Sequence, residues 1–356
     1  MKLWRVLLVA NYQIEYSIQL ANALSEIADV VLPIWNRLVP DLMRLVDDRV
    51  TVSPLGSPGA TVAQKLWGQH GIATLARHHK MDVVHFQNAY AWSVPWIPVT
   101  STPTWVLTVH DPFPHVGLRD PLSFASIAAH LTRADSVIVL GRNQKKDFLT
   151  RFHFNSERVT VVPHGEFSFF SRYGPALHQV DETVLFIGRI APYKGLDVFL
   201  RAAIEIAAKF PKVGFRIVGE GDLTPYRALA ASVPRLRITN RFVTGEEFLD
   251  AVASAAIVVA PYLESSQSGI VIAAQSLGRP VVASRVNGIM EDVLPGETGI
   301  LVEPGDCEGL VEAVSSLIQN PSGMESMGKK AREWMKTERS WARIARQTLD
   351  VYEAAQ

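Results

Sequence analysis

Short, continuous runs of apolar residues alternate with helical stretches along almost the whole chain. A strand that is buried on both faces needs apolar residues at successive positions, whereas a strand with one wet face alternates apolar and polar residues. Continuous runs that alternate with helices therefore predict parallel sheets with crossover helices, an α/β fold. In the first half the runs are RVLLVA (5–10), DVVHFQ (82–87), TWVLTVHD (104–111), SVIVL (136–140) and VTVVPHG (159–165).

A second series of apolar runs follows an irregular segment. Residues 166–183 mix aromatic residues with Gly, Pro and charges without a clean period, which indicates a linker. With 356 residues, the chain is also longer than one hydrophobic core usually spans. We therefore predict two doubly wound Rossmann-like domains, residues 1–170 and 180–337, with ligands at the carboxyl ends of the strands. The second series is TVLFIG (183–188), FRIVG (215–219), RITNRF (237–242), AIVVAP (256–261), PVVAS (280–284) and GILV (299–302).

The composition argues against several classes of protein. Lys and Arg total 35, as do Asp and Glu, so the charge gives no reason to expect a nucleic-acid partner. A single cysteine, Cys307, excludes an internal disulfide and indicates a reducing, cytoplasmic compartment. The opening MKLWRVLLVANYQ has an apolar core of only about five residues, too short for a signal peptide, so we expect a buried strand there. No run approaches the roughly 18 apolar residues of a membrane span.

A turn with two cations follows the first strand of the second series. In GRIAPYKG, Arg189 and Lys194 lie between a strand end at Gly188 and an apolar helical face that begins near Gly195. Such a turn combines free N–H groups, a helix dipole and positive charge, which suits phosphate oxygens. Tyr193 stands where a P-loop needs glycine, so the turn is not that motif. Taken alone, the pattern also fits an ordinary surface turn.

Two further turns offer the same kind of site. VGEGD (218–222) follows the next strand but lacks the third glycine of the dinucleotide fingerprint. In PYLESSQSGIVIAAQSLGRPVVAS (261–284), Ser268 and Gly269 open a helix, which leaves the N–H groups at 269–271 free for an anion. Three such turns at one edge of a sheet favour a phosphate-containing ligand.

In this order, the motifs resemble those of retaining glycosyltransferases of family 4, which have the two-domain GT-B fold. The resemblance covers nearly the whole chain and is strongest from about 159 to 302. It implies an N-terminal acceptor-binding domain and a C-terminal donor-binding domain that face an interdomain cleft, with helix 338–356 packed back onto the first domain.

The resemblance also implies the reaction. A sugar passes from a nucleoside-diphosphate sugar to a glycan, lipid-linked or small-molecule acceptor, in polysaccharide or glycoconjugate biosynthesis. In such retaining hexosyltransferases the leaving phosphate is thought to take the proton of the acceptor, so no protein nucleophile is needed. We expect no metal and no other cofactor, and the sequence contains no D-x-D motif.

Roles for individual residues follow from the same resemblance. Arg189 and Lys194 match the cations that bind the donor diphosphate. Glu264 matches an acidic contact to the donor sugar, and His110 matches a histidine that faces this sugar. Glu291 matches the acid of a G-G-x-P-E loop, although a structural role fits equally well. The remaining contacts to the nucleotide sugar are implied at Gly188, Gly219, Phe242, Val243, Ser268, Gly269 and Ile270.

The chain departs from the family pattern at three places. ESSQSG replaces the usual E-G-F-G, which marks a variant branch with a Q-S-G turn. The second Glu of the family's E-x7-E, which holds the ribose, falls at Ala273 or Ala274, with Gln275 as a substitute. The glycine-rich loop after the first strand is missing, and its place is taken by Tyr12, Gln13 and Glu15.

Other interpretations stay open. A GT-B sugar-nucleotide epimerase, a dehydrogenase built on VGEGD, or a non-catalytic GT-B scaffold or binding subunit would share much of the pattern. Trp92, Trp96 and Trp105 fit aromatic core packing or an acceptor-facing or lipid-facing surface. GRNQKKDFLTRFHF (141–154) sets basic residues near three phenylalanines and predicts peripheral contact with the inner face of a membrane, while a solvated helix fits as well.

Overall fold

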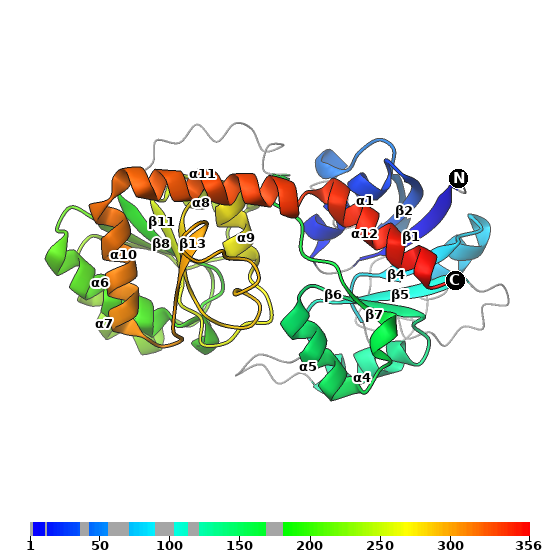
Figure 1. The fold of residues 1–356 in the computed structure, drawn as a ribbon, viewed down its shortest axis with the longest axis horizontal. Coiled ribbons are helices and arrows are strands. Elements are labelled where there is room, and N and C mark those ends of the chain that lie inside the picture. Colours follow the sequence, from blue (N-terminus) through cyan, green and yellow to red (C-terminus); the bar gives the residue numbers. More distant parts are fainter. Residues whose placement is uncertain are drawn as a thin grey trace. The chain divides into compact units, whose positions relative to one another are not determined.

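The computed structural model contains two compact units (Figure 1). It describes residues 3–10, 13–35, 43–55, 71–89, 103–112, 121–168 and 181–356. Unit 1 takes the described residues up to Gly165 together with Ser340–Gln356, and unit 2 takes Glu166–Arg339. Each unit has one parallel sheet with helices on both faces, which confirms the predicted α/β class with two doubly wound sheets.

Unit 1 contains a seven-stranded sheet in the order β3-β2-β1-β4-β5-β6-β7. Every neighbouring pair is parallel. The order reverses between β1 and β4, which makes this the switch point where a ligand is expected. The strands are β1 (Trp4–Val9), β2 (Ala28–Trp35), β3 (Thr51–Leu55), β4 (Val83–Phe86), β5 (Thr104–Val109), β6 (Ser136–Val139) and β7 (Val159–Val161).

Two of these strands, β2 and β3, were missed by the sequence analysis. Each contains a proline, which lacks an N–H group and argues against an interior strand position. In the structure, β1 pairs with β2 only up to the pair Leu7 and Val31, so Pro33 lies beyond that ladder. Pro54 is tolerated because β3 forms the edge of the sheet.

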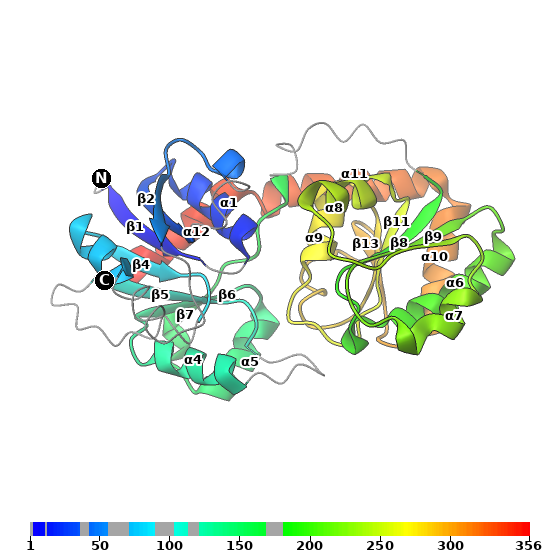
Figure 2. The ribbon, with the colours of Figure 1, turned by 180° about the vertical axis from the view of Figure 1, so that it is seen from behind.

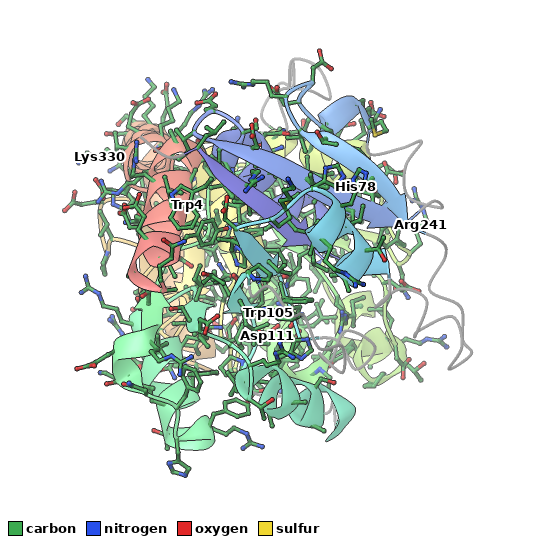
Figure 3. The ribbon with its side chains drawn as sticks, turned by 90° about the vertical axis from the view of Figure 1, so that its right-hand side faces the viewer. Trp4, His78, Trp105, Asp111, Arg241 and Lys330 are labelled. Carbon is green, nitrogen blue, oxygen red and sulfur yellow. The ribbon has the colours of Figure 1, made fainter. Side chains whose placement is uncertain are left out.

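Helices cover both faces of this sheet. One face packs against α4 (Pro121–Leu131) and α5 (Arg142–Phe152). The other face carries α1 (Ile14–Leu24) and α12 (Trp341–Ala354), which lie side by side (Figures 1 and 2). Trp4 lies beside α12 (Figure 3), with its ring centroid 6.4 Å from that of Tyr352. The buried side chains of α12 include Trp341, Ile344, Leu349 and Tyr352.

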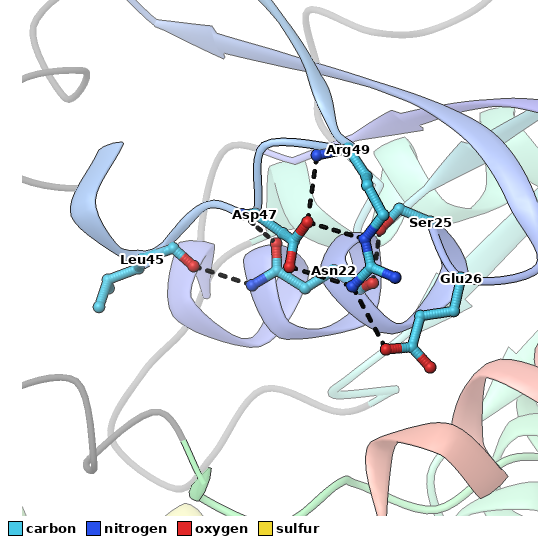
Figure 4. Close-up of polar contacts among 6 residues, drawn as sticks. All are labelled: Asn22, Ser25, Glu26, Leu45, Asp47 and Arg49. Atoms are coloured by element: carbon cyan, nitrogen blue, oxygen red, sulfur yellow. Dashed lines mark hydrogen bonds and ion pairs between the residues drawn. The ribbon is translucent and has the colours of Figure 1, made fainter.

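Polar contacts hold the C-terminal end of α1 (Figure 4). Asn22 Nδ2 donates to the carbonyl oxygen of Leu45 at 2.8 Å, and the N–H of Asp47 donates to Asn22 Oδ1 at 2.8 Å. Arg49 then bridges the carboxylates of Asp47, at 2.9 Å, and Glu26, at 3.3 Å. One asparagine therefore fixes the loop before β3 against α1.

Unit 2 contains a six-stranded parallel sheet in the order β10-β9-β8-β11-β12-β13. Each strand lies within, or overlaps, a run of the second predicted series. The order reverses between β8 and β11. The strands are β8 (Thr183–Ile187), β9 (Gly214–Val218), β10 (Leu236–Thr239), β11 (Ile257–Ala260), β12 (Val281–Ser284) and β13 (Gly299–Val302).

The helices of unit 2 also cover two faces. One core contains the apolar sides of α6 (Leu196–Lys209) and α10 (Cys307–Gln319), and the other contains those of α8 (Gly245–Ser254) and α9 (Gly269–Ser276). The short α7 (Arg227–Ala231) lies near α6, and α11 (Pro321–Glu338) packs on α9. Short 3-10 turns lie at Met43–Leu45, Ser156–Arg158, Pro192–Lys194 and Thr224–Tyr226.

The membrane prediction for α5 is wrong for one of its three phenylalanines. Phe148 is fully buried, and Phe152 and Phe154 pack half-buried against the same core. Phe148 therefore belongs to the core of unit 1 and is not free to enter a bilayer. Among the helices that the structure describes, none is long and apolar enough to cross a membrane. The basic residues that remain exposed on α5 are Arg142, Lys146 and Arg151.

Trp105 packs in the core of unit 1, as one of the two interpretations predicted. Its ring stacks on Phe86 with centroids 5.2 Å apart, and the guanidinium of Arg133 lies 5.3 Å from its centroid. Trp92 and Trp96 lie outside the described residues, so the interpretation of these two stays a prediction.

Candidate functional site

The turn after β8 is locked to the turn after β11 by a glycine. Gly195 has a φ of 68°, and a Cβ atom at this position would lie 1.9 Å from the carbonyl oxygen of Pro261. Only glycine fits such a conformation and approach. The N–H of Leu263 also donates to the carbonyl oxygen of Tyr193 at 2.8 Å. Two of the three predicted turns therefore form one structure at the switch point of the sheet.

Lys194 lies on a buried tyrosine beside the start of α9. Its Nζ is 3.7 Å from the ring centroid of Tyr262 and 5.1 Å from that of Tyr193, a cation–π arrangement. Ser268 Oγ donates to Tyr262 Oη at 3.4 Å and accepts from the N–H of Val271 at 3.4 Å, which caps α9. The ammonium group and the helix start are thus held by the same tyrosine.

The first turn of α9 offers donors for an anion. The N–H groups of Gly269 and Ile270 have no intrahelical partner, because they belong to the first turn. A Cβ atom on Gly188 would lie 3.7 Å from the side chain of Ile270, so the end of β8 adjoins this helix start. Arg189 is exposed and, like Lys194, has no carboxylate partner among the residues that the structure describes. Unpaired cations near a helix N-terminus form an electropositive site.

A cavity of about 560 Å³ lies next to Arg189. A Cβ atom on Gly219 would lie 1.9 Å from the carbonyl oxygen of Gly188, so glycine lets the turns after β8 and β9 meet in the cavity wall. Phe242 is 78% exposed, an unusual environment for its ring. The predicted residues that line the cavity are Gly188, Arg189, Gly219, Phe242 and Val243.

The turn that carries Phe242 is braced by an ion pair that the sequence analysis missed. Arg241 (labelled in Figure 3) donates two hydrogen bonds to the carboxylate of Glu247, at 2.9 and 2.5 Å, and one to the carbonyl oxygen of Phe242 at 3.1 Å. Glu247 also accepts from the N–H of Thr244 at 2.9 Å, and Thr244 Oγ1 caps α8. These bonds lower the pKa of Glu247 to about 2, chiefly through Arg241.

Glu264 is half-buried in the turn between β11 and α9. The loop after β12 packs on this turn, because a Cβ atom on Gly288 would lie 2.1 Å from the carbonyl oxygen of Ser266. The N–H of Gly288 donates to the carbonyl oxygen of Ser265 at 3.2 Å. Among the described residues, no three His, Cys, Asp or Glu side chains gather as a metal ion would require.

A buried acid in the same loop, Asp292, was also missed. Arg339 Nη2 lies 2.7 Å from Asp292 Oδ1, and both side chains are more than nine-tenths buried. Burial raises the pKa of Asp292 to about 6, against the opposing effect of Arg339. Gln275 Nε2 donates to the carbonyl oxygen of Asp292 at 2.8 Å, and Gln275 is fully buried like Ala273 and Ala274. The three side chains proposed for the position of the second Glu therefore belong to the core.

His110, at the end of β5, is 2% exposed. Its Nε2 has no hydrogen-bond partner among the residues that the structure describes. Tyr16 meets the ring edge-on with centroids 5.1 Å apart. Gln144 Nε2 donates to the carbonyl oxygens of Val109, at 3.1 Å, and of His110, which fixes the end of the strand.

Of the residues expected in place of the glycine-rich loop, Tyr12 lies outside the described residues. Gln13 precedes α1 with a φ of 52°, and its carbonyl oxygen accepts from the N–H of Ser17 at 3.1 Å. Glu15 lies in the first turn of α1. In this segment a glutamine, not a glycine, adopts the left-handed backbone conformation just before α1.

Acid should destabilise unit 1 through its buried histidines. Burial lowers the pKa of both His85 and His110 to about 3, whereas an unfolded histidine titrates near 6.5. The stability from each neutral ring is therefore present above pH 6.5 and lost as the pH falls toward 3. At pH 4.5 the loss is about 2–3 kcal/mol per ring.

The measurement is the free energy of unfolding of wild type, His110→Asn and the control His78→Gln at pH 7.5 and 4.5. His78 is exposed (Figure 3). Between pH 7.5 and pH 4.5, the free energy of unfolding of His110→Asn should fall by about 2–3 kcal/mol less than that of wild type, because one buried ring no longer has to become charged. An equal pH dependence for His110→Asn and His78→Gln would contradict the prediction.

Comparison with known proteins identifies the family. A model described as Glycosyltransferase Family 4 matches residues 17–165, and one described as Glycosyl transferases group 1 matches residues 181–320. The chain is 29% identical over 249 residues to a D-inositol 3-phosphate glycosyltransferase of Nocardioides sp., covering 62% of this chain and 54% of the relative. It is 26% identical to a glycogen synthase of Mycobacterium tuberculosis over 62% of this chain and 55% of the relative. The chain thus spans about half the length of these relatives.

Solved structures share the fold over the whole chain. The Anabaena Alr3699/HepE complex with UDP and glucose superposes with a TM-score of 0.75 at 15% identity, covering 99% of this chain and 100% of that one. A sucrose-phosphate synthase from Thermosynechococcus elongatus gives 0.72 at 20% identity, covering 99% and 98%. The first family model matches the sheet of unit 1, and the second matches the sheet of unit 2. The chain belongs to glycosyltransferase family 4 and has the GT-B fold.

Proposed function

We propose that the chain is a retaining, metal-independent hexosyltransferase. It transfers a sugar from a nucleoside-diphosphate sugar to a glycan, lipid-linked or small-molecule acceptor in polysaccharide or glycoconjugate biosynthesis. One observation carries the proposal: Arg189 and Lys194 have no carboxylate partner in the part of the chain that the structure describes, and they lie at the edge of the sheet where α9 begins. The HepE structures support a uridine nucleotide as the first ligand to test, since they contain UDP or UDP-glucose.

In this proposal, Arg189, Lys194 and the first N–H groups of α9 bind the diphosphate. Negative charge grows on the leaving phosphate as the bond to the sugar breaks, so these groups bind the transition state more strongly than the ground state. Tyr262 holds the ammonium group of Lys194 before the donor arrives, which reduces the ordering that binding requires.

The remaining residues recognise the sugar and the base. The unpartnered Nε2 of His110 forms a hydrogen bond with a sugar hydroxyl, and Glu264 accepts another. The exposed ring of Phe242 offers a face on which the base stacks at the 560 Å³ cavity, next to the main chain of Val243. We place the reaction in the cytoplasm, in keeping with the single Cys307. The exposed basic residues of α5 support only an electrostatic contact with an anionic membrane.

The test is a thermal-shift panel of UDP, GDP, ADP and UDP-glucose, followed by assays of turnover. A nucleotide at 100 times its Kd should stabilise the protein by about 2.7 kcal/mol. Release of UDP from UDP-glucose, with the anomeric configuration kept in the transferred glucose, would support the transferase. Binding without turnover would favour a scaffold, and interconversion of UDP-sugars an epimerase. No stabilisation by any nucleotide would refute the proposed site.

A further inference from the structure

Four rings from distant parts of the chain meet around Tyr16 in unit 1. Tyr16 lies in the first turn of α1, and its ring centroid is 5.1 Å from that of His110 and 4.8 Å from that of His164. Trp341, the first residue of α12, lies 5.1 Å from Tyr16 on the same measure. His110 directly follows β5 and His164 comes shortly after β7, so the cluster lies at the carboxyl ends of the strands, where doubly wound sheets bind ligands.

The neighbouring rings hold Tyr16 in one place. His164 Nδ1 lies 2.6 Å from the carbonyl oxygen of Gly165, which ties this ring to the main chain. A Cβ atom on Gly165 would lie 2.5 Å from the ring of Trp341, so a glycine is needed for the tryptophan to pack there. Tyr16 itself is 6% exposed. Its hydroxyl is therefore fixed in position before any ligand arrives, as a binding group should be.

The fold makes no use of the Tyr16 hydroxyl. This hydroxyl has no hydrogen-bond partner among the described residues, whereas the hydroxyl of Tyr352, another buried tyrosine of unit 1, lies 2.7 Å from His85 Nδ1. A phenylalanine at position 16 would make the same ring contacts, so packing does not explain the oxygen. Burial raises the pKa of Tyr16, so the hydroxyl stays protonated near neutral pH and can both donate and accept.

His110 brings a second unused polar atom into the same cluster. Its Nε2 is buried and has no partner in the part of the chain that the structure describes. The rings of Tyr16 and His110 meet edge-on, with an angle of 87° between their planes. Neighbouring hydroxyl groups of one sugar offer donors and acceptors to two such side chains at once.

We propose that Tyr16 is a further substrate-binding residue, whose hydroxyl forms a hydrogen bond with a hydroxyl group of the donor sugar beside His110. This inference rests on the proposed transfer of a sugar from a nucleoside-diphosphate sugar. It assigns a role to the first turn of α1, which in this chain replaces a glycine-rich loop.

Tyr16→Phe tests the inference, because it removes the hydroxyl and keeps the ring. We expect the affinity for UDP-glucose, and kcat/KM for its hydrolysis or transfer, to fall about 3–10-fold, the loss of one hydrogen bond between uncharged groups. The affinity for UDP should not change, because UDP lacks the sugar, and the melting temperature should not fall, because no bond within the protein is lost. The losses in Tyr16→Phe and His110→Asn should be coupled, because the two side chains bind one sugar.

The matched control is Tyr352→Phe, which removes the same atom from another buried ring of unit 1. Its hydroxyl has a partner in His85, so this variant should lower the melting temperature and leave the affinity for UDP-glucose unchanged. Wild-type affinity and kcat/KM for UDP-glucose in Tyr16→Phe would overturn the inference. If the wild type binds UDP-glucose without any turnover, the proposed function fails, while the comparison of UDP-glucose and UDP affinities still decides the role of Tyr16.

Discussion

Replacing Arg189 and Lys194 together with alanine is expected to lower kcat/KM for sugar transfer by about 10²–10⁴-fold. Hydrogen bonds to charged groups are worth about 1.5–3 kcal/mol each, and both residues are proposed to hold one diphosphate. The two losses should be coupled, because the residues share a ligand. Since negative charge grows in the transition state, kcat should fall along with nucleotide affinity.

The fold should survive both substitutions. Arg189 is exposed, and the ammonium group of Lys194 lies on the rings of Tyr193 and Tyr262 without a carboxylate partner among the described residues. The measurements are transfer rate and UDP affinity for the single and double variants, with melting temperature beside them. Arg201→Ala is a matched control, because Arg201 lies on the exposed side of α6 and pairs with Asp197 at 2.9 Å.

Arg189→Lys separates charge from geometry. A lysine keeps the charge but cannot form two parallel hydrogen bonds with a phosphate, so only part of the rate should return. Near-wild-type rates in well-folded Arg189→Ala and Lys194→Ala would mean that this turn holds no phosphate. The proposed function would then lose its main chemical support.

The sequence was sufficient to predict both sheets, because a parallel strand buried on both faces leaves a continuous apolar run. It failed for β2, which contains Pro33 and was not among the predicted runs. The extent of the ladder between β1 and β2 decides whether that proline costs a hydrogen bond, and strand pairing is not visible in one sequence. For the same reason, the close approach of Gly195 to Pro261 appeared only in the structure, although the glycine itself was noticed.

Two kinds of site information lay beyond the sequence. Asp292 and Arg339 are 47 positions apart and carry no motif, so nothing marked them as partners. His85 stood inside the run DVVHFQ and read as an interior strand residue, which it is, without any sign of Tyr352 as its partner. Phe148 shows the opposite failure, because a helix with mixed residues does not reveal which face lies against the core.

Arg339→Ala is expected to destabilise unit 2 by about 3–5 kcal/mol, because it leaves the carboxylate of Asp292 buried without its cation. Arg339 Nη2 also donates to the carbonyl oxygen of Glu291 at 2.8 Å, so the loop after β12 loses two contacts. Urea unfolding at pH 8 and pH 5, with hydrogen exchange in α9 as the local probe, measures the effect. Lys329→Ala on α11 is the control, since its pair with Glu325 is exposed and contributes little to stability.

The pH dependence identifies the cause of this loss. The folded pKa of Asp292 already lies above its unfolded value of 3.8, and removal of Arg339 raises it further. A group with a raised folded pKa stabilises the protein at low pH and loses that contribution as the pH rises, so Arg339→Ala should be less damaging at pH 5 than at pH 8. Adding Asp292→Asn should recover part of the stability at pH 8, because no buried charge remains. Equal losses at both pH values, with no recovery in the double variant, would show that Arg339 acts through packing and not through its charge.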